Sequence, residues 1–268
     1  MKHLLLPILL IFLLALPFTG CQKHYPVADK LSQAEICMDE EPEAALRVLE
    51  SIGQPDLHTK EHRARYALLY SQALDKNYID LTNDSLINIA VDYYKDRDDV
   101  RAKFLSYYYQ GRIYTNANNL TQATLAYLEA EQLVDELGDG YAAGLLYEQI
   151  GLIYRSYYDF PKSLQAYQQA IEHYTKANRP FHKIYNMFSA SDIYRNTQKE
   201  DAAYQTLKTA LAESRKLNDQ SLIKSCINNL IVVCIDLERW EEATQWYQEY
   251  QKNNGRDYPT VTFYGYIA

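Results

Sequence analysis

Several signatures of catalytic and cofactor-binding proteins are missing from this sequence of 268 residues. It has no glycine-rich phosphate loop and no G-x-S-x-G nucleophile elbow, and it contains only 9 glycines and 4 cysteines. Cys226 and Cys234 are eight residues apart on one expected helix, which is too far to form a disulfide. We therefore expect these cysteines and Cys37 to be buried small residues, and we predict no cofactor and no enzymatic activity.

Positive charge is also scarce. The sequence has 35 Asp and Glu residues against 27 Lys and Arg residues, which gives a formal net charge of -8. Affinity for nucleic acid comes mainly from neutralised phosphates, and docking on anionic lipid needs a basic surface. The composition therefore predicts no nucleic-acid partner and no electrostatic docking on a membrane.

One short motif has the form used by a class of zinc peptidases. His58 and His62 occur in an H-x-x-E-H arrangement with Glu61. On a helix the two imidazoles would share a face, and Glu61 would be placed to act as a base. The stretch follows Gly53 and Pro55, and no apolar wall excludes water from it. We therefore predict no metal site here.

The longest apolar run lies at the N-terminus, over residues 4–16. A membrane-spanning helix needs ~20 residues, so this run indicates a cleaved signal peptide, residues 1–20. Thr19-Gly20 before Cys21 resembles the bacterial lipoprotein cleavage box. That resemblance implies acylation of Cys21, a tether over residues 21–26, and a lipid anchor in a bacterial membrane of the cell envelope, with the chain periplasmic or surface-facing. The alternative is an ordinary signal peptide with Cys21 incidental.

The sequence does contain a pattern of 40 residues that occurs four times. In the clearest copy a small residue, Gly111, precedes Tyr114, and Ala123, Tyr127 and Ala130 follow. This order is typical of a helix, a short turn and a second helix. Small residues let antiparallel helices approach closely, and tyrosines fill the space beside them. The small residue that opens each second helix recurs at Ala123, Ser163, Ala203 and Ala243.

This block resembles a tetratricopeptide repeat (TPR). Its period of 40 residues, against ~34 in the family, indicates longer helices or longer connections. The resemblance implies an all-α fold, a TPR-like α-solenoid of about six antiparallel helix pairs over residues 27–268. The matching residues are Tyr107, Gly111, Tyr114, Ala123, Tyr127 and Ala130 in one copy and Tyr147, Gly151, Tyr154, Tyr167 and Ala170 in the next.

The expected units run over about residues 27–53, 62–99, 104–140, 144–180, 184–220 and 224–255. Residues 258–268 look like the opening of a further unit. We therefore expect this sequence to be part of a longer protein.

In the TPR family the first helix of each pair lines a concave groove, and the resemblance implies that ligands bind there. Aromatic side chains give contact area, and Arg or Asn side chains bond a backbone or a carboxylate. By register, the predicted ligand-binding residues are Tyr108, Tyr109, Arg112, Asn116, Glu148, Gln149, Arg155, Tyr185, Phe188, Asp192, Arg195, Asn196, Asn228 and Asn229.

From these residues we predict a membrane-anchored scaffold that binds another protein or an extended peptide. Two alternatives stay open. One is a sensor or receptor module of a longer signalling protein. The other is a glycan-binding lipoprotein, which the 26 tyrosines suggest.

Overall fold

The computed structural model describes residues 27–254, and this range contains helices and connecting turns but no strands. Every helix in this range is too short or too polar to cross a bilayer. The predicted signal peptide, Cys21, the tether at 21–26 and the further unit at 258–268 lie outside the described residues.

The described helices form six pairs, as the sequence predicts. The first helices of the pairs are α2 (Val27–Cys37), α4 (Lys60–Lys76), α6 (Val100–Asn116), α9 (Gly140–Ser156), α11 (Pro180–Asn196) and α13 (Gln220–Asp236). The second helices are α3 (Pro42–Glu50), α5 (Ser85–Tyr94), α7 (Leu120–Glu131) with the short α8 (Val134–Leu137), α10 (Phe160–Lys176), α12 (Glu200–Leu217) and α14 (Trp240–Asn254). A 3-10 turn, η1 (Gln54–Asp56), lies between the first and second pairs.

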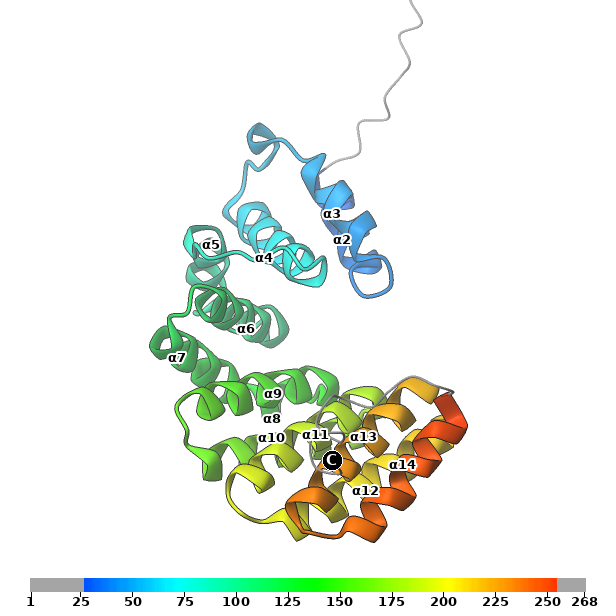
Figure 1. Cartoon of the computed structure of the whole chain (residues 1–268). Coiled ribbons are helices and arrows are strands. Elements are labelled where there is room, and N and C mark those ends of the chain that lie inside the picture. The colour runs from blue at the N-terminus through cyan, green and yellow to red at the C-terminus, as the bar shows by residue number, and fades with distance from the viewer. Residues whose placement is uncertain (1–26, 255–268) are drawn as a thin grey trace, which may run out of the picture.

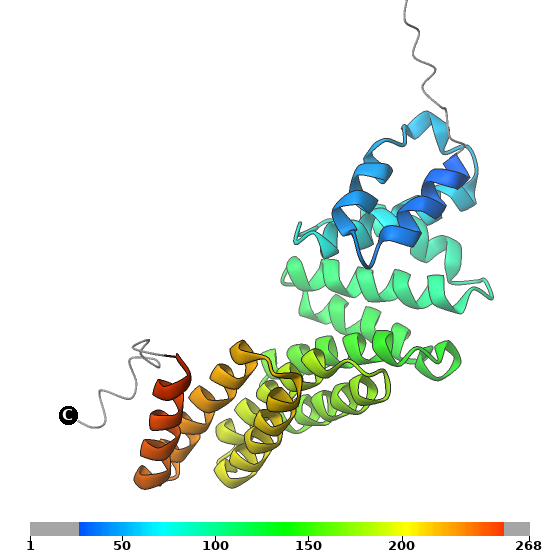
Figure 2. The same ribbon diagram turned by 90° about the vertical axis from the view of Figure 1, so that its right-hand side faces the viewer.

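The pairs stack side by side into a curved array (Figure 1). Helices α4 and α6 lie on the inner side of the curve, and α5 and α7 lie on its outer side. After a rotation of the view, the stack is seen to change direction near α9 (Figure 2). We call α4, α6, α9, α11 and α13 the inner helices. The fold is therefore an α-solenoid whose first helices face the concave side.

The step of 40 residues reappears in the turns. Asn178 and Asn218 are left-handed residues that end the second helices of neighbouring pairs, with φ of 52° and 53°. Asp99, Asp139 and Asp219 accept hydrogen bonds from backbone N–H groups at the start of the first helices α6, α9 and α13. The left-handed residue inside each pair also keeps this step, at Tyr78, Asn118, Tyr158, Gln198 and Glu238.

The two helices of a pair approach closely where a tyrosine ring of the second helix lies against a glycine of the first. The ring of Tyr127 lies against Gly111, and the ring of Tyr167 lies against Gly151. A Cβ atom on Gly151 would be 2.7 Å from a Tyr167 ring carbon, which is closer than real Cβ contacts allow. Both rings are fully buried. Glycine is therefore needed at these positions, because the tyrosine ring of the second helix packs directly on the backbone of the first helix.

The two cysteines of α13 are buried with free thiols, which confirms the expectation for them. Burial raises the pKa of the Cys234 thiol to about 11, and the nearby charge of Glu242 adds to this shift. Both side chains pack among the apolar residues of the last two pairs. Cys37 is free and half-buried.

Replacing Gly151 by Ala is expected to lower the free energy of unfolding by about 1–3 kcal/mol, because the new Cβ overpacks the ring of Tyr167. Chemical denaturation measures this change. Gly140→Ala is the matched control, since its Cβ would be 3.4 Å from the nearest atom, the His173 carbonyl oxygen. Adding Tyr167→Leu to Gly151→Ala should restore part of the loss. Equal stability of the two glycine variants would contradict the packing account.

Candidate functional site

Three of the predicted ligand-binding residues belong to the core. Tyr108 and Tyr109 are each 5% exposed, and Gln149 is 7% exposed. The Tyr108 ring packs edge-on against Tyr109 at 5.0 Å and lies 6.2 Å from the ring of Tyr127. Burial raises the pKa of both phenols on α6. The expectation that these side chains present surface in the groove is therefore wrong, because neighbouring helices cover Tyr108 and Tyr109 on α6 and Gln149 on α9.

Arg112 connects three successive inner helices. Its Nε donates a hydrogen bond to Oδ1 of Asp75 on α4 at 2.9 Å. Its Nη1 donates to Oε1 of Gln149 on α9 at 3.0 Å. About three quarters of each charged side chain in the Arg112–Asp75 pair is buried. This arginine therefore holds neighbouring pairs together and is not free to meet a ligand. Asn116 is half-buried beside it.

The same kind of bond links the later inner helices. Glu148 on α9 accepts hydrogen bonds from Nδ2 of Asn186 on α11 and from the Tyr174 hydroxyl, both at 2.9 Å. Arg195 on α11 donates from Nε to Oδ2 of Asp236 on α13 at 2.7 Å. We call this set the inner polar ladder, and it consists of Asp75, Arg112, Gln149, Glu148, Asn186, Arg195 and Asp236.

The asparagines on α13 are half-buried. Nδ2 of Asn229 donates to the Ser225 carbonyl of its own helix at 3.0 Å. Asn228 also interacts with other residues of the chain. These two side chains therefore present little open surface.

An accessible group remains on α9 and α11. Tyr185 is 57% exposed, and its ring meets that of Phe188 edge-to-face at 6.0 Å. Arg155 and Asn196 are exposed, and Asp192 is half-buried. Burial raises the pKa of Asp192, and the positive charge of Arg155 opposes this shift. We call these five residues the inner aromatic patch. It offers ring area, hydrogen-bonding groups and charges of both signs.

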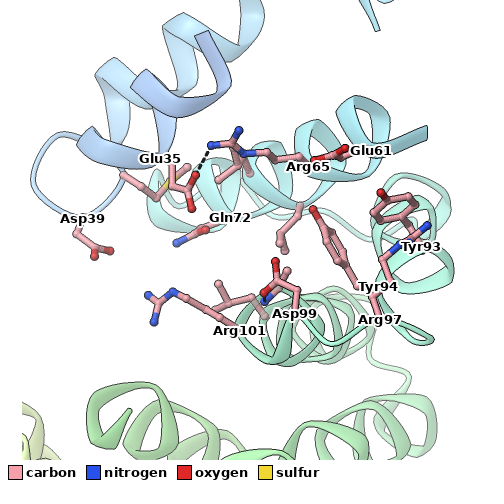
Figure 3. Close-up of a pocket in the computed structure, with 15 residues that line it drawn as sticks. Glu35, Asp39, Glu61, Arg65, Gln72, Tyr93, Tyr94, Arg97, Asp99 and Arg101 are labelled. Carbon is pink, nitrogen blue, oxygen red and sulfur yellow. Dashed lines mark hydrogen bonds and ion pairs between the residues drawn. The ribbon is translucent and has the colours of Figure 1, made fainter. Parts of the chain in front are cut away.

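A second accessible feature is a cavity of about 430 Å³ near the N-terminal end of the stack (Figure 3). It is enclosed by α2, α4, the end of α5 and the start of α6. Leu68, Leu69 and Leu105 are among its lining residues, and we call these three the leucine floor; charged side chains also line the cavity. We call it the N-terminal cavity.

Sequence reasoning did not predict this cavity, and of its lining residues only Glu61 was considered, as part of the H-x-x-E-H motif. The first helix of the second unit keeps the 40-residue step, since Tyr78 after α4 is equivalent to Asn118 after α6. Helix α5 departs from it, because α5 begins at Ser85 whereas α7 begins at Leu120. The groove residues predicted from the register began at Tyr108 and therefore did not include the cavity. The charged residues next to Tyr93 and Tyr94 could have indicated the cavity. Charged and tyrosine side chains at the end of a short helix face either solvent or a cleft.

The H-x-x-E-H motif does not lie on one helix. Thr59 is the N-cap of α4, and its hydroxyl accepts a hydrogen bond from the His62 N–H at 3.0 Å. His58 therefore precedes the helix and does not share a face with His62. Between residues 27 and 254, no group of three or more His, Cys, Asp and Glu side chains is placed to hold a metal ion.

No protein-family model matches the sequence, and no curated protein matches it either. Solved structures do match its fold. A STAND protein with a tetratricopeptide repeat sensor, PH0952 from Pyrococcus horikoshii, has a TM-score of 0.70 at 16% identity, over 90% of this chain and 37% of that chain. The apo form of RapI has a TM-score of 0.66 at 15% identity, over 89% of this chain and 69% of that chain.

A third solved structure is a Rap protein complexed with Competence and Sporulation Factor. It has a TM-score of 0.57 at 18% identity, over 85% of this chain and 65% of that chain. At these identities the likeness concerns the fold alone. The fold expected from the repeat pattern, a TPR-like solenoid, is confirmed.

Arg112→Ala is expected to lower the free energy of unfolding by about 2 kcal/mol, because it leaves Asp75 partly buried without its partner. Arg47→Ala is the matched control, since the Arg47–Glu43 pair is mostly exposed and should contribute almost nothing. Urea denaturation of both variants compares the two pairs. If the two variants lost equal stability, the inner polar ladder would not be a stabilising element.

Proposed function

Starting from the TPR-like fold, we propose that this chain is a scaffold that binds another protein or an extended peptide on its concave side. The observation that carries the proposal is the inner aromatic patch. Tyr185 is more than half exposed on an inner helix and contacts Phe188, and Arg155 and Asn196 are exposed on α9 and α11. Aromatic and arginine side chains are the types that dominate binding energy at protein interfaces.

The arrangement of the patch supports binding of an extended chain. The edge-to-face pair of Tyr185 and Phe188 gives a rigid apolar surface that costs little side-chain entropy on binding. Arg155 and Asn196 add donors for carbonyl or carboxylate groups. The complex of a structurally similar Rap protein with Competence and Sporulation Factor is consistent with ligand binding by this fold. In this proposal the protein acts by binding rather than by catalysis.

A second candidate is a sensor module, in which ligand binding is passed to another part of a longer protein. The similarity to a protein with a tetratricopeptide repeat sensor favours this candidate. The concave binding surface is the same in both candidates, and they differ only in what the bound state does.

We also propose that the chain is held at a bacterial membrane by lipid on Cys21. The support is the apolar run at residues 4–16 and the Thr19-Gly20-Cys21 sequence. An anchored scaffold gains from high local concentration, so a weak site can still recruit its partner.

Metabolic labelling with an alkyne fatty acid tests the anchor. The wild-type chain is expected to carry the label and to sediment with membranes, and Cys21→Ser should lose both properties. Cys37→Ser is the control and should behave as wild type, because Cys37 lies within the helical array. Label that persists in the Cys21→Ser protein would contradict the proposal.

Peptide selection tests the binding surface even though the natural partner is unidentified. Random peptides displayed on phage are selected on the immobilised chain, and fluorescence anisotropy then measures the affinity of the synthetic peptides. Tyr185→Ala combined with Phe188→Ala should weaken binding about tenfold or more, because these rings supply the main contact area.

The control for this experiment lies on the outer helix α7. Leu125 and Leu128 are 52% and 39% exposed there, so their double Ala variant removes apolar surface from the convex side. It should leave the affinity unchanged. Equal affinity of the Tyr185/Phe188 variant and wild type, with both proteins folded, would remove the concave patch as the binding surface.

A further inference from the structure

The N-terminal cavity contains a buried polar side chain without a partner. Gln72 on α4 is only 9% exposed, and its amide forms no hydrogen bond with any described residue. Figure 3 shows this amide aimed into the space enclosed by α2, α4 and α6. Its carbonyl and NH₂ groups are therefore open to the cavity and can bond a polar ligand.

Two of the three arginines around the cavity are already paired with carboxylates. The guanidinium of Arg65 donates to the Ser32 hydroxyl at 3.2 Å and forms an ion pair with Glu35. Arg101 forms an ion pair with Asp139 at 2.9 Å, and Asp139 is not part of the cavity wall.

Arg97, the third arginine of the wall, forms no ion pair with the described residues. Its guanidinium carbon lies 3.8 Å from the centre of the Tyr93 ring, a cation–π contact.

Two carboxylates of the wall, Asp99 and Glu61, are also without an ion-pair partner, so unpaired acidic groups outnumber the one unpaired arginine. Asp99 is the N-cap of α6 and accepts a hydrogen bond from the Ala102 N–H at 2.9 Å, which uses one lone pair of one oxygen. Glu61 forms no hydrogen bond or ion pair with the described residues, and it lies at the edge of the cavity (Figure 3). Asp39, also on the wall, pairs with Lys76 at 3.0 Å.

The pKa of the Tyr94 hydroxyl reflects the charged groups around the cavity. Burial is the main cause that raises the pKa of Tyr94 to about 12, and the negative charge of Asp99 raises it further while Arg65 opposes the shift. The phenol therefore stays neutral and can accept a hydrogen bond from a cation. Figure 3 shows Tyr94, Asp99 and Gln72 around one common space.

The apolar residues of the cavity indicate that part of the ligand is apolar. Leu68, Leu69 and Leu105 form its floor, and its volume of about 430 Å³ is in the range of small-ligand sites. Lysine and arginine carry a long apolar stem below a charged head. A stem on the leucines would bring the head among Asp99, Tyr94 and Gln72.

We infer that the N-terminal cavity binds a basic side chain, lysine or arginine, of the segment held on the concave side. The head donates hydrogen bonds to Asp99 and to the Gln72 carbonyl, and the stem covers the leucine floor. This inference rests on the proposed function, because it assigns one position of the bound segment. It predicts that the partner carries a basic residue near the end of the segment that meets α4 and α6.

Methyl and amide NMR spectra of the labelled chain test the cavity with small compounds. N-acetyl-arginine amide and N-acetyl-lysine amide are titrated, with N-acetyl-norleucine amide and N-acetyl-glutamate amide as the uncharged and acidic counterparts. The basic compounds should shift the Gln72 amide and Leu105 methyl signals in a saturable way. The other two should not.

Two substitutions locate the charge that matters. Asp99→Asn removes the carboxylate but keeps a good N-cap for α6, and it should weaken binding of the basic compounds about fivefold or more. Asp98→Asn makes the same charge change at an exposed residue outside the cavity wall and should leave binding unchanged. Gln72→Leu should weaken binding as well, since it removes the open carbonyl.

The outcomes separate this inference from the proposed function. Basic compounds that bind equally to wild type and Asp99→Asn, or an acidic compound that binds better than they do, would overturn it. Failure of all compounds to bind, together with peptides that bind the inner aromatic patch, would overturn the cavity assignment and leave the scaffold function intact. Saturable, Asp99-dependent binding of the basic compounds supports the assignment even if the Tyr185/Phe188 variant still binds peptide.

Discussion

The close approach of a tyrosine ring to a glycine backbone is the contact on which the rest of this structure depends. Gly151 and Tyr167 meet with no room for a Cβ atom, and Gly111 and Tyr127 do the same one pair earlier. In the next pair the same two positions hold Ser191 and Leu207, a larger residue opposite a smaller one. The combined volume of the two facing side chains stays similar, so the distance between the two helices stays similar. Helix pairs with the same spacing can then stack into a regular curve.

The inner polar ladder fixes the positions of neighbouring inner helices along this curve. Hydrogen bonds and ion pairs between partners 37 to 41 residues apart, such as Asp75–Arg112 and Arg195–Asp236, join each inner helix to the next. These side chains are polar because they lie on the concave side, but their partners belong to the chain itself. Ligand contacts are therefore left to the residues between the ladder positions, the inner aromatic patch and the N-terminal cavity. The concave side combines a fixed frame with two accessible regions.

The sequence was sufficient for the fold because the repeat is local. Small residues at a constant interval, and Asn or Gly followed by Asp at the turns, determine where each helix ends and which side it packs. The buried state of Tyr108 and Tyr109 was not predictable, because one repeat does not say which side of its helix the neighbouring pairs cover. Arg112 looks the same in sequence whether its partner is Asp75 or a ligand. The N-terminal cavity is lined by four helices, of which α2 and α5 do not keep the 40-residue step.

A crystal structure of the chain with a selected peptide bound tests the central claim, that the concave side is the working surface of this solenoid, most directly. The account predicts a peptide that lies across α4, α6, α9 and α11, in contact with Tyr185. A peptide bound instead along the outer helices α5, α7, α10 or α12 would contradict it.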